Sequence, residues 1–226
     1  MSTSKNILVI APHPDDEVLG CGGVIARHSS RGDLVQVVVV SRGAPDIFPA
    51  EEIEQTRSEL SAAHKLLGVK ETHFLDFPAP RLDTVPGHVL ADTLTRLVRE
   101  IRPQTVYAPH WGDLHSDHKA VYWATMVATR PTGGPGVERL LCYETLSETE
   151  WGGASADSAF SPTVFVNIGE FLSIKLEAMA CYRTQLKESP HSRSLRSIEA
   201  LARLRGSSVC LDAAEAFVLV RDVVTA

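Results

Sequence analysis

The segment from Leu34 to Ser41 constrains the fold most, because it is apolar and β-branched almost without a break. A strand with one solvated face alternates apolar and polar residues, whereas a strand covered on both faces has no need to. Such strands belong mainly to parallel sheets with helices packed on either side. The segment therefore predicts a central, doubly covered strand of a parallel sheet.

The rest of the chain alternates short apolar segments with helical patterns. Further strands are predicted at Ile7–Ile10, Thr72–Phe77, Thr105–Ala108, Arg139–Tyr143, Thr163–Val166 and Phe217–Val220. Helices are predicted at Glu17–Ser30, Glu51–Leu67, Val89–Ile101, His118–Ala128, Phe171–Leu186 and Leu195–Leu204. This order predicts a single α/β domain over residues 1–226, with a mostly parallel sheet and helices on both faces.

Composition limits the classes of partner. The net charge of −6 and the pI near 5.8 argue against a nucleic acid or an anionic membrane as the main partner. We find no apolar run long enough for a membrane span, and the start of the chain does not resemble a signal peptide. The four cysteines form no Cys-x-x-Cys pair, which favours buried thiols in a reducing compartment. We therefore expect a cytoplasmic protein.

The turn after the first predicted strand concentrates charge. It reads His13-Pro14-Asp15-Asp16-Glu17, and we call it the first cluster. Carboxylates this close repel one another, and a divalent cation would relieve the repulsion. Ligands of open α/β sheets bind at the carboxyl ends of strands, where this cluster lies. Histidine with aspartate is also a common ligand set for zinc.

A second cluster, His110 to His118, follows the strand Thr105–Ala108 and holds three histidines and two aspartates. In a parallel sheet both clusters fall on the same edge. His115 and His118 share one helix face, and Asp117 between them is able to orient an imidazole. Catalytic zinc usually has three protein ligands, which His13, Asp16 and one of the late histidines would supply.

Each cluster alone also has an ordinary explanation. Acidic residues in the first turn of a helix stabilise its dipole by about 0.3–1 kcal/mol, and a pair of histidines is more often packed or solvated than ligating. The two clusters at neighbouring strand ends favour a divided metal site over both explanations.

These residues resemble the PIG-L/LmbE-like family of zinc-dependent N-deacetylases. The signature of that family is a His-Pro-Asp-Asp-Glu loop after the first strand and a later His-x-Asp-His, which match His13–Glu17 and His115–His118. Supporting similarity lies in Glu17–Ala26, in Arg57, Glu59 and Leu67-Gly68, and in Lys175, Ala178, Tyr182 and Gln185. The resemblance implies a Rossmann-like fold, in agreement with the strand–helix alternation.

The resemblance also implies a role for each matching residue. His13, Asp16 and His118 would bind Zn²⁺, although another divalent transition metal suits the same ligands. Asp15 would be the general base. His115 would stabilise the oxyanion or protonate the leaving amine, with Asp117 orienting it. Arg57 would bind substrate, since the resemblance places it on the helix that lines the sugar pocket; its alternative is a solvated helix arginine.

The activity implied is removal of the N-acetyl group from an N-acetylglucosamine-type sugar or its conjugate, releasing acetate and the free amine. A zinc amidase that cleaves a larger acyl group is the alternative within enzymes, and the loops Arg130–Gly136 and Gly152–Pro162 would then set the pocket size. A non-catalytic sugar-binding module is the alternative outside enzymes, and a broken motif would favour it. The sequence does not specify the aglycone of the small-molecule substrate, nor whether the protein forms a homo-oligomer.

The remaining polar residues receive simpler interpretations. Glu17 fits a first-turn helix residue better than a ligand, and His64 has no partner pattern. Lys175 is expected to face solvent or a neighbouring element. Gly20, Gly22 and Gly23 suit close helix–sheet packing rather than a phosphate loop. His110 and Asp113 are left without an assigned role.

Overall fold

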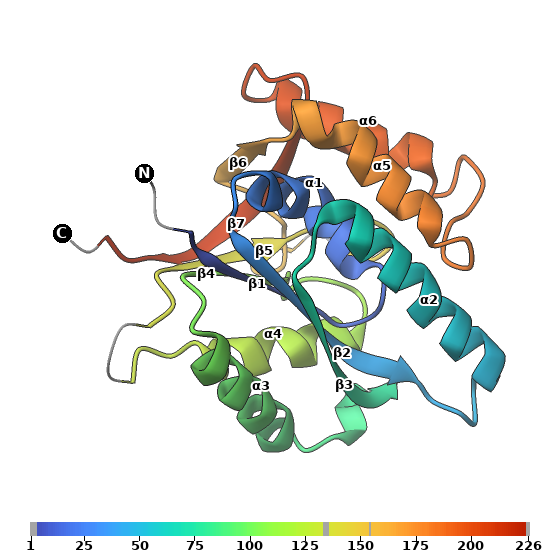
Figure 1. Cartoon of the computed structure of the whole chain (residues 1–226), viewed down its shortest axis with the longest axis vertical. Helices are drawn as coiled ribbons and strands as arrows, with labels where there is room; N and C mark the ends of the chain where they lie inside the picture. Colours follow the sequence, from blue (N-terminus) through green and yellow to red (C-terminus); the bar gives the residue numbers. More distant parts are fainter. Residues whose placement is uncertain (1–3, 133–135, 154, 225–226) are drawn as a thin grey trace.

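The computed structural model describes residues 4–132, 136–153 and 155–224. Its strands form one seven-stranded sheet in the order β3-β2-β1-β4-β5-β7-β6 (Figure 1). The strands are β1 (Asn6–Ala11), β2 (Leu34–Gly43), β3 (Glu71–Ala79), β4 (Thr105–Pro109), β5 (Arg139–Tyr143), β6 (Val164–Asn167) and β7 (Ala214–Asp222). The helices are α1 (Asp16–Ser30), α2 (Ala50–Leu67), α3 (Gly87–Ile101), α4 (Ser116–Ala128), α5 (Leu172–Cys181) and α6 (Leu195–Ser207).

The predicted fold class is confirmed. β2 pairs in parallel with β1 and β3, and β4 pairs in parallel with β1 and β5. Only the far edge is antiparallel in the described sheet, because β7 runs against both β5 and β6. Helices α3 and α4 cover one face, while α1, α2, α5 and α6 cover the other (Figure 1). Val37 to Val40 of β2 are fully buried, as a doubly covered strand requires.

Strand β1 contributes to two apolar cores. Ile7 and Val9 pack with α1, α2 and α5 on one face, whereas Leu8 and Ile10 pack with α3 and α4 on the other. Polar contacts fix its two ends. The Asn6 amide Nδ2 donates to the carbonyl of Ile101 at 3.0 Å, and the Tyr143 hydroxyl donates to the carbonyl of Ile10 at 2.9 Å.

The end of α5 differs from the prediction. A helix was expected to continue to Leu186, but α5 ends at Cys181 and Tyr182 leaves the helical conformation. Tyr182 is fully buried, and its hydroxyl donates to Glu17 near the start of the chain. A side chain committed to that contact ends the helix, so residues 182–194 form a long connection to α6.

A buried ion pair contacts the middle of α1. Lys175 of α5 and Glu215 of β7 are 3% and 5% exposed, and Lys175 Nζ lies 2.6 Å from Glu215 Oε1. Lys175 also donates to the carbonyl of Leu19, and Glu215 accepts from the backbone N–H groups of Gly23 and Val24. Of the two expected positions for Lys175, toward solvent or toward a neighbouring element, the structure shows the second.

The packing role predicted for the α1 glycines is confirmed. A Cβ atom on Gly20 would lie 2.3 Å from the Tyr143 ring, and one on Gly23 would lie 2.8 Å from Ile168. Both glycines thus permit α1 to approach the sheet closely. The cysteines match less well, because Cys21 and Cys142 are buried while Cys210 is exposed. No helix within the described ranges is both long and apolar enough to cross a membrane.

The strand order reverses direction at β1 and β4. From β1 the chain builds outward through β2 and β3, and then returns to place β4 on the other side of β1. The helices that follow β1 and β4 lie on opposite faces of the sheet (Figure 1). Ligands of open α/β sheets bind at such a switch point. Both clusters of the sequence lie at this switch point.

Candidate metal centre and active-site cleft

The first cluster is held in a strained turn. Asp15 has φ 107°, in the left-handed region, and directly precedes α1. Asp15, Asp16 and Glu17 are each no more than 2% exposed. A left-handed conformation is uncommon for a residue with a side chain, and such strain is concentrated at functional sites. The turn thus buries three carboxyl groups where solvent does not compensate their charges.

The second cluster is organised by the start of α4. His115 is the N-cap residue, and its Nδ1 accepts a hydrogen bond from the backbone N–H of Asp117 at 3.1 Å. Asp117 and His118 in the first turn of α4 are fully buried. The helix start therefore directs both side chains toward the sheet edge, where β1 ends.

The two clusters meet at Asp16. Its Oδ2 lies 3.2 Å from His13 Nδ1 and 3.2 Å from His118 Nε2. The three residues each offer one ligand atom, and these atoms all lie within 4.8 Å of one another. His13, Asp16 and His118 are the three residues that the sequence predicted as metal ligands. The structure brings them together although about a hundred residues separate the two clusters.

The donor atoms of this trio fit a metal ion. Nε2 of His118 is buried and has no hydrogen-bond partner among the described residues. Its Nδ1 lies 2.8 Å from Asp113 Oδ2, and Asp113 Oδ1 accepts from Thr149 at 2.6 Å. A carboxylate on one ring nitrogen fixes the tautomer and leaves the other nitrogen free to bind metal. Asp113, which the sequence left without a role, is thus part of the site.

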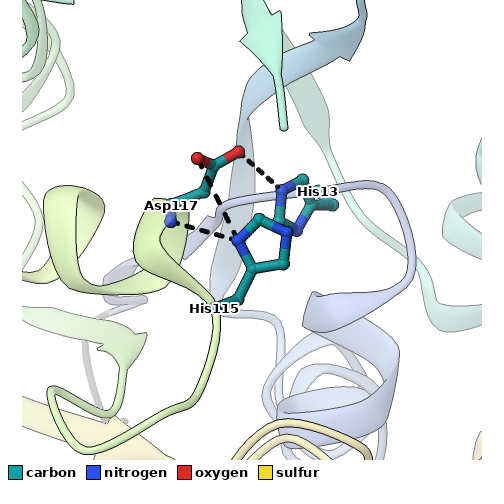
Figure 2. A group of neighbouring side chains, drawn as sticks. All are labelled: His13, His115 and Asp117. Carbon is teal, nitrogen blue, oxygen red and sulfur yellow. Dashed lines mark hydrogen bonds and ion pairs between the residues drawn. The ribbon is translucent and has the colours of Figure 1, made fainter. Parts of the chain in front are cut away.

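A second trio, His13, His115 and Asp117, also lies close together (Figure 2). Its polar atoms already have partners. Asp117 Oδ2 lies 3.1 Å from His13 Nε2, and Asp117 Oδ1 accepts from the backbone N–H of Leu82 at 2.9 Å. The carboxylate of Asp117 thus contacts His13, and is 4.0 Å from His115 Nδ1. The first trio is therefore the better candidate for a metal centre.

The first trio retains protons when it holds no cation. Burial disfavours a charged imidazole, but hydrogen bonds to Asp117 and Asp16 prevail and raise the pKa of His13 to about 9. Burial also lowers the pKa of His118, but the neighbouring Asp16 and Asp113 outweigh burial and raise this pKa to about 10. Burial also acts against a charged Asp16, yet His118 and His13 hold its pKa well below the ordinary value. The cluster thus replaces a missing cation with protons.

Glu17 is more than a first-turn helix residue. It is fully buried, and its Oε1 accepts from the Tyr182 hydroxyl and lies 3.2 Å from His64 Nε2. Its Oε2 accepts from the backbone N–H of Asp15 at 3.2 Å. Glu17 lies in the first turn of α1, as predicted, and also has the buried contacts just described. The interpretation of His64 as a residue without partners is wrong. Together with Tyr182 they hold the strained turn.

A cleft of about 440 Å³ opens beside the two clusters. His13, Asp15 and His115 line its inner end, and Phe48, Ile53 and Phe74 form an apolar wall. Arg57 of α2 lines the cleft as predicted, paired with Asp76 and stacked 4.6 Å from the centre of the Phe74 ring. No described residue of the loops 130–136 and 152–162 lines it; residues 133–135 and 154 lie outside the described ranges.

Fold and site place this chain among α/β proteins with a His/Asp cluster at the switch point of a mostly parallel sheet. A family model described as GlcNAc-PI de-N-acetylase, PIG-L, matches residues 8–129, which is more than half of the chain. The chain belongs to this PIG-L family, as the motifs predicted.

Individual relatives support the assignment. The chain is 33% identical over 189 residues to a protein named uncharacterized deacetylase YaiS of Escherichia coli, covering 80% of this chain and 91% of that protein. It is 27% identical to a diacetylchitobiose deacetylase of Thermococcus kodakarensis, covering 81% and 71%. The crystal structure of the conserved protein TT1542 of Thermus thermophilus superposes with a TM-score of 0.79 at 29% identity, covering 98% and 97%.

Proposed function

We propose that this protein is a metal-dependent N-deacetylase of an N-acetylglucosamine-type sugar or its conjugate, releasing acetate and the free amine. The observation that carries the proposal is the His13–Asp16–His118 trio with Asp15 and His115 beside it on one cleft. The chitobiose deacetylase relative supports the substrate class. A binding module would not need a base and an imidazole donor next to a metal centre.

His13, Asp16 and His118 would hold the metal, for which Zn²⁺ is our proposal. When bound, zinc lowers the pKa of a water molecule from 15.7 toward about 7 and polarises a carbonyl group. The chain supplies what an acetamide additionally requires, a base and a hydrogen-bond donor. Asp113 supports the trio by holding the His118 ring in one orientation.

Asp15 would accept the proton from the attacking water. Its carboxylate lines the cleft and does not contact the imidazoles of the trio. Burial raises its pKa to about 8 in the protein without metal, although Arg193 lowers it. A divalent charge nearby favours the ionised form and so prepares Asp15 to act as a base at neutral pH. A positioned base of this kind contributes about 10²–10⁴-fold to the rate.

His115 would stabilise the oxyanion of the tetrahedral intermediate. Its Nδ1 accepts from the backbone of Asp117, so in the neutral ring the proton is assigned to Nε2. Burial, and then the charge of His13, lower its pKa, which keeps the ring neutral near pH 7. A neutral ring in this tautomer donates one hydrogen bond from Nε2.

Arg57 would contact the sugar conjugate at the apolar wall. Its pairing with Asp76 and its stacking on Phe74 hold the guanidinium in place before substrate arrives. The volume of the cleft accommodates a small conjugate, and cleavage of a larger acyl group is the alternative that a substrate panel decides.

The test combines metal analysis with an assay of acetate release. Zinc-loaded protein is supplied with N-acetylglucosamine, its conjugates and longer N-acyl analogues, and the free amine is confirmed by mass. We expect His118→Ala to lose zinc, and Asp15→Ala to retain zinc but lose acetate release. Asp92→Ala, on the exposed surface of α3, is the control. Loaded wild-type protein that releases acetate from none of these substrates would contradict the proposal.

A further inference from the structure

The general base has a single tether. The carboxylate of Asp16 contacts two histidines, and that of Asp117 contacts His13 and the backbone of Leu82. The carboxylate of Asp15 has one hydrogen-bond partner within the described residues, the guanidinium of Arg193. Arg193 Nη1 lies 3.3 Å from Asp15 Oδ2, and no hydrogen bond is formed by Oδ1.

Arg193 comes from a distant part of the chain. It lies in the connection between α5 and α6 and lines the cleft, with 21% of its side chain exposed. Asp15, which matches the family signature, thus has its hydrogen-bond partner 178 positions later in the chain. The match to the family model ends at residue 129, before this partner.

The guanidinium itself is held in place. Its Nε donates to the Ser147 hydroxyl at 2.6 Å, and its Nη2 lies 3.5 Å from Glu148 Oε1. Gln185 Oε1 lies 3.4 Å from the nitrogen that meets Asp15. A planar guanidinium fixed at several nitrogens presents the remaining N–H in one direction. Its direction is therefore set before substrate enters.

The connection that carries Arg193 has main-chain and capping contacts of its own. The backbone of Arg193 donates to His191 Nδ1 and accepts from the N–H of Lys187. Ser194 caps α6 by accepting from the N–H of Ser197. The side chain thus adds contacts to the cleft, whereas main-chain and capping contacts shape the connection.

We propose that Arg193 is the positioning residue of the general base: it holds Oδ2 of Asp15 and leaves Oδ1 free to accept the proton. This inference rests on the proposed function of Asp15. Without this contact the Asp15 side chain is able to adopt another staggered rotamer about χ1. Misplacement by about 1 Å costs about 10²-fold in rate.

The first experiment measures steady-state kinetics of zinc-loaded variants. We expect Arg193→Gln to lower kcat about 10²-fold, with KM and zinc content close to those of the wild type. Arg193→Lys keeps a charge that reaches one carboxylate oxygen and should recover part of kcat. Arg196→Gln, an exposed arginine three residues later, is the matched control. Unchanged kcat, or an effect on KM alone, would overturn the proposal.

A second variant leaves the guanidinium in place. Ser147→Ala removes only the contact at Nε, and we expect a smaller loss of kcat in the same direction, without a change in the thermal midpoint. A loss of kcat in Arg193→Gln that is matched by lost zinc or lost folding would instead assign a structural role.

Crystal structures separate this inference from the proposed function. In Arg193→Gln the Asp15 carboxylate should adopt another rotamer while His13, Asp16 and His118 stay in place. An unmoved Asp15 would refute the positioning role even with an active enzyme. Wild-type protein without activity on any amino sugar would refute the proposed function, and the rotamer comparison would still decide whether Arg193 aims Asp15.

Discussion

Helix α1 passes two buried groups of charged side chains, and they are built differently. In the middle of the helix, Lys175 and Glu215 satisfy each other, the Leu19 carbonyl and two backbone N–H groups. At its start, Asp16 meets two histidines, and Nε2 of His118 is left without a hydrogen bond. The first group is a closed network of one cation and one anion. The second is an open network that protons or a metal ion must complete.

The difference separates a structural charge from a functional one. Burial does not distinguish the two groups, since the side chains of Lys175, Glu215, Asp16 and His118 are all nearly inaccessible. A buried nitrogen without a hydrogen bond destabilises the folded state. Such a nitrogen is retained where a bound ligand or metal ion offsets that cost. The unpartnered nitrogen, together with the His/Asp ligand set, distinguishes the candidate metal centre from the closed ion pair.

Asp16→Asn breaks the open network and should have the largest effect. The amide keeps the shape of the side chain but loses the charge that holds zinc. We expect zinc binding to be lost and kcat/KM to fall by about 10⁴-fold or more, because both the activated water and the polarised carbonyl depend on the metal. Metal content and acetate release measure this. Retained zinc with full activity would assign the metal to other residues.

Lys175→Met breaks the closed network and should affect stability instead of chemistry. The carboxylate of Glu215 is then buried without a cation, which typically costs about 3–5 kcal/mol of unfolding free energy. Urea unfolding checks this, with the exposed Lys187→Met as control. The folded fraction should keep its zinc affinity and kcat, and a selective loss of zinc would show that the two networks are coupled.

The double variant Lys175→Met/Glu215→Leu sharpens the same comparison. A buried ion pair can often be replaced by apolar residues without loss. Here Glu215 also accepts from Gly23 and Val24, so its removal leaves two backbone N–H groups without that acceptor. We therefore expect the double variant to recover only part of the lost stability, and full recovery would contradict this account of the network.

Zinc binding to the open network should release protons, an effect smaller than the changes in activity and stability predicted above. With pKa values of about 9 and about 10, His13 and His118 are protonated at neutral pH in the metal-free protein. Titration calorimetry in buffers of different ionisation enthalpy should therefore detect release of about two protons per zinc. Zinc affinity should rise with pH up to about 9, and pH-independent affinity would contradict the protonated state.

The same pKa values predict how the metal-free protein responds to pH. Both exceed the ordinary histidine value of 6.5, so above that pH the folded state binds more protons than the unfolded state. Its stability should therefore fall as the pH rises toward 9 and 10. Zinc-loaded protein should lack this decline, because these protons have already left.

Much of this organisation was predictable from local pattern. The β-branched segment at Leu34–Ser41 predicted the doubly covered strand. The two motifs predicted His13, Asp16 and a late histidine as ligands, and the family resemblance selected His118. These signals are short-range, since strand pattern, helix periodicity and the order of residues in a turn are all contained in about ten residues.

The supporting residues were not predictable in this way. Arg193, Tyr182 and Glu215 meet the first cluster or α1 across 165 to 192 positions. Such contacts depend on how α5, the following connection and β7 pack, and no periodicity in the sequence specifies them. Lys175 was expected to face solvent or a neighbouring element, and the helical pattern did not decide between them. Its burial follows from Glu215, which lies on another element.

The double role of β1 has a consequence for the fidelity of the site. Both faces of this strand are apolar, so a register shift by one residue would replace one apolar side chain with another in each core. The two cores therefore disfavour such a shift only weakly. Such a shift would displace His13 by about 3.3 Å along the strand direction and turn its side chain toward the opposite face of the sheet. The hydrogen bonds of Asn6 and of the Ile10 carbonyl therefore fix the register of β1. By doing so they also fix the position of the candidate metal ligands that follow the strand.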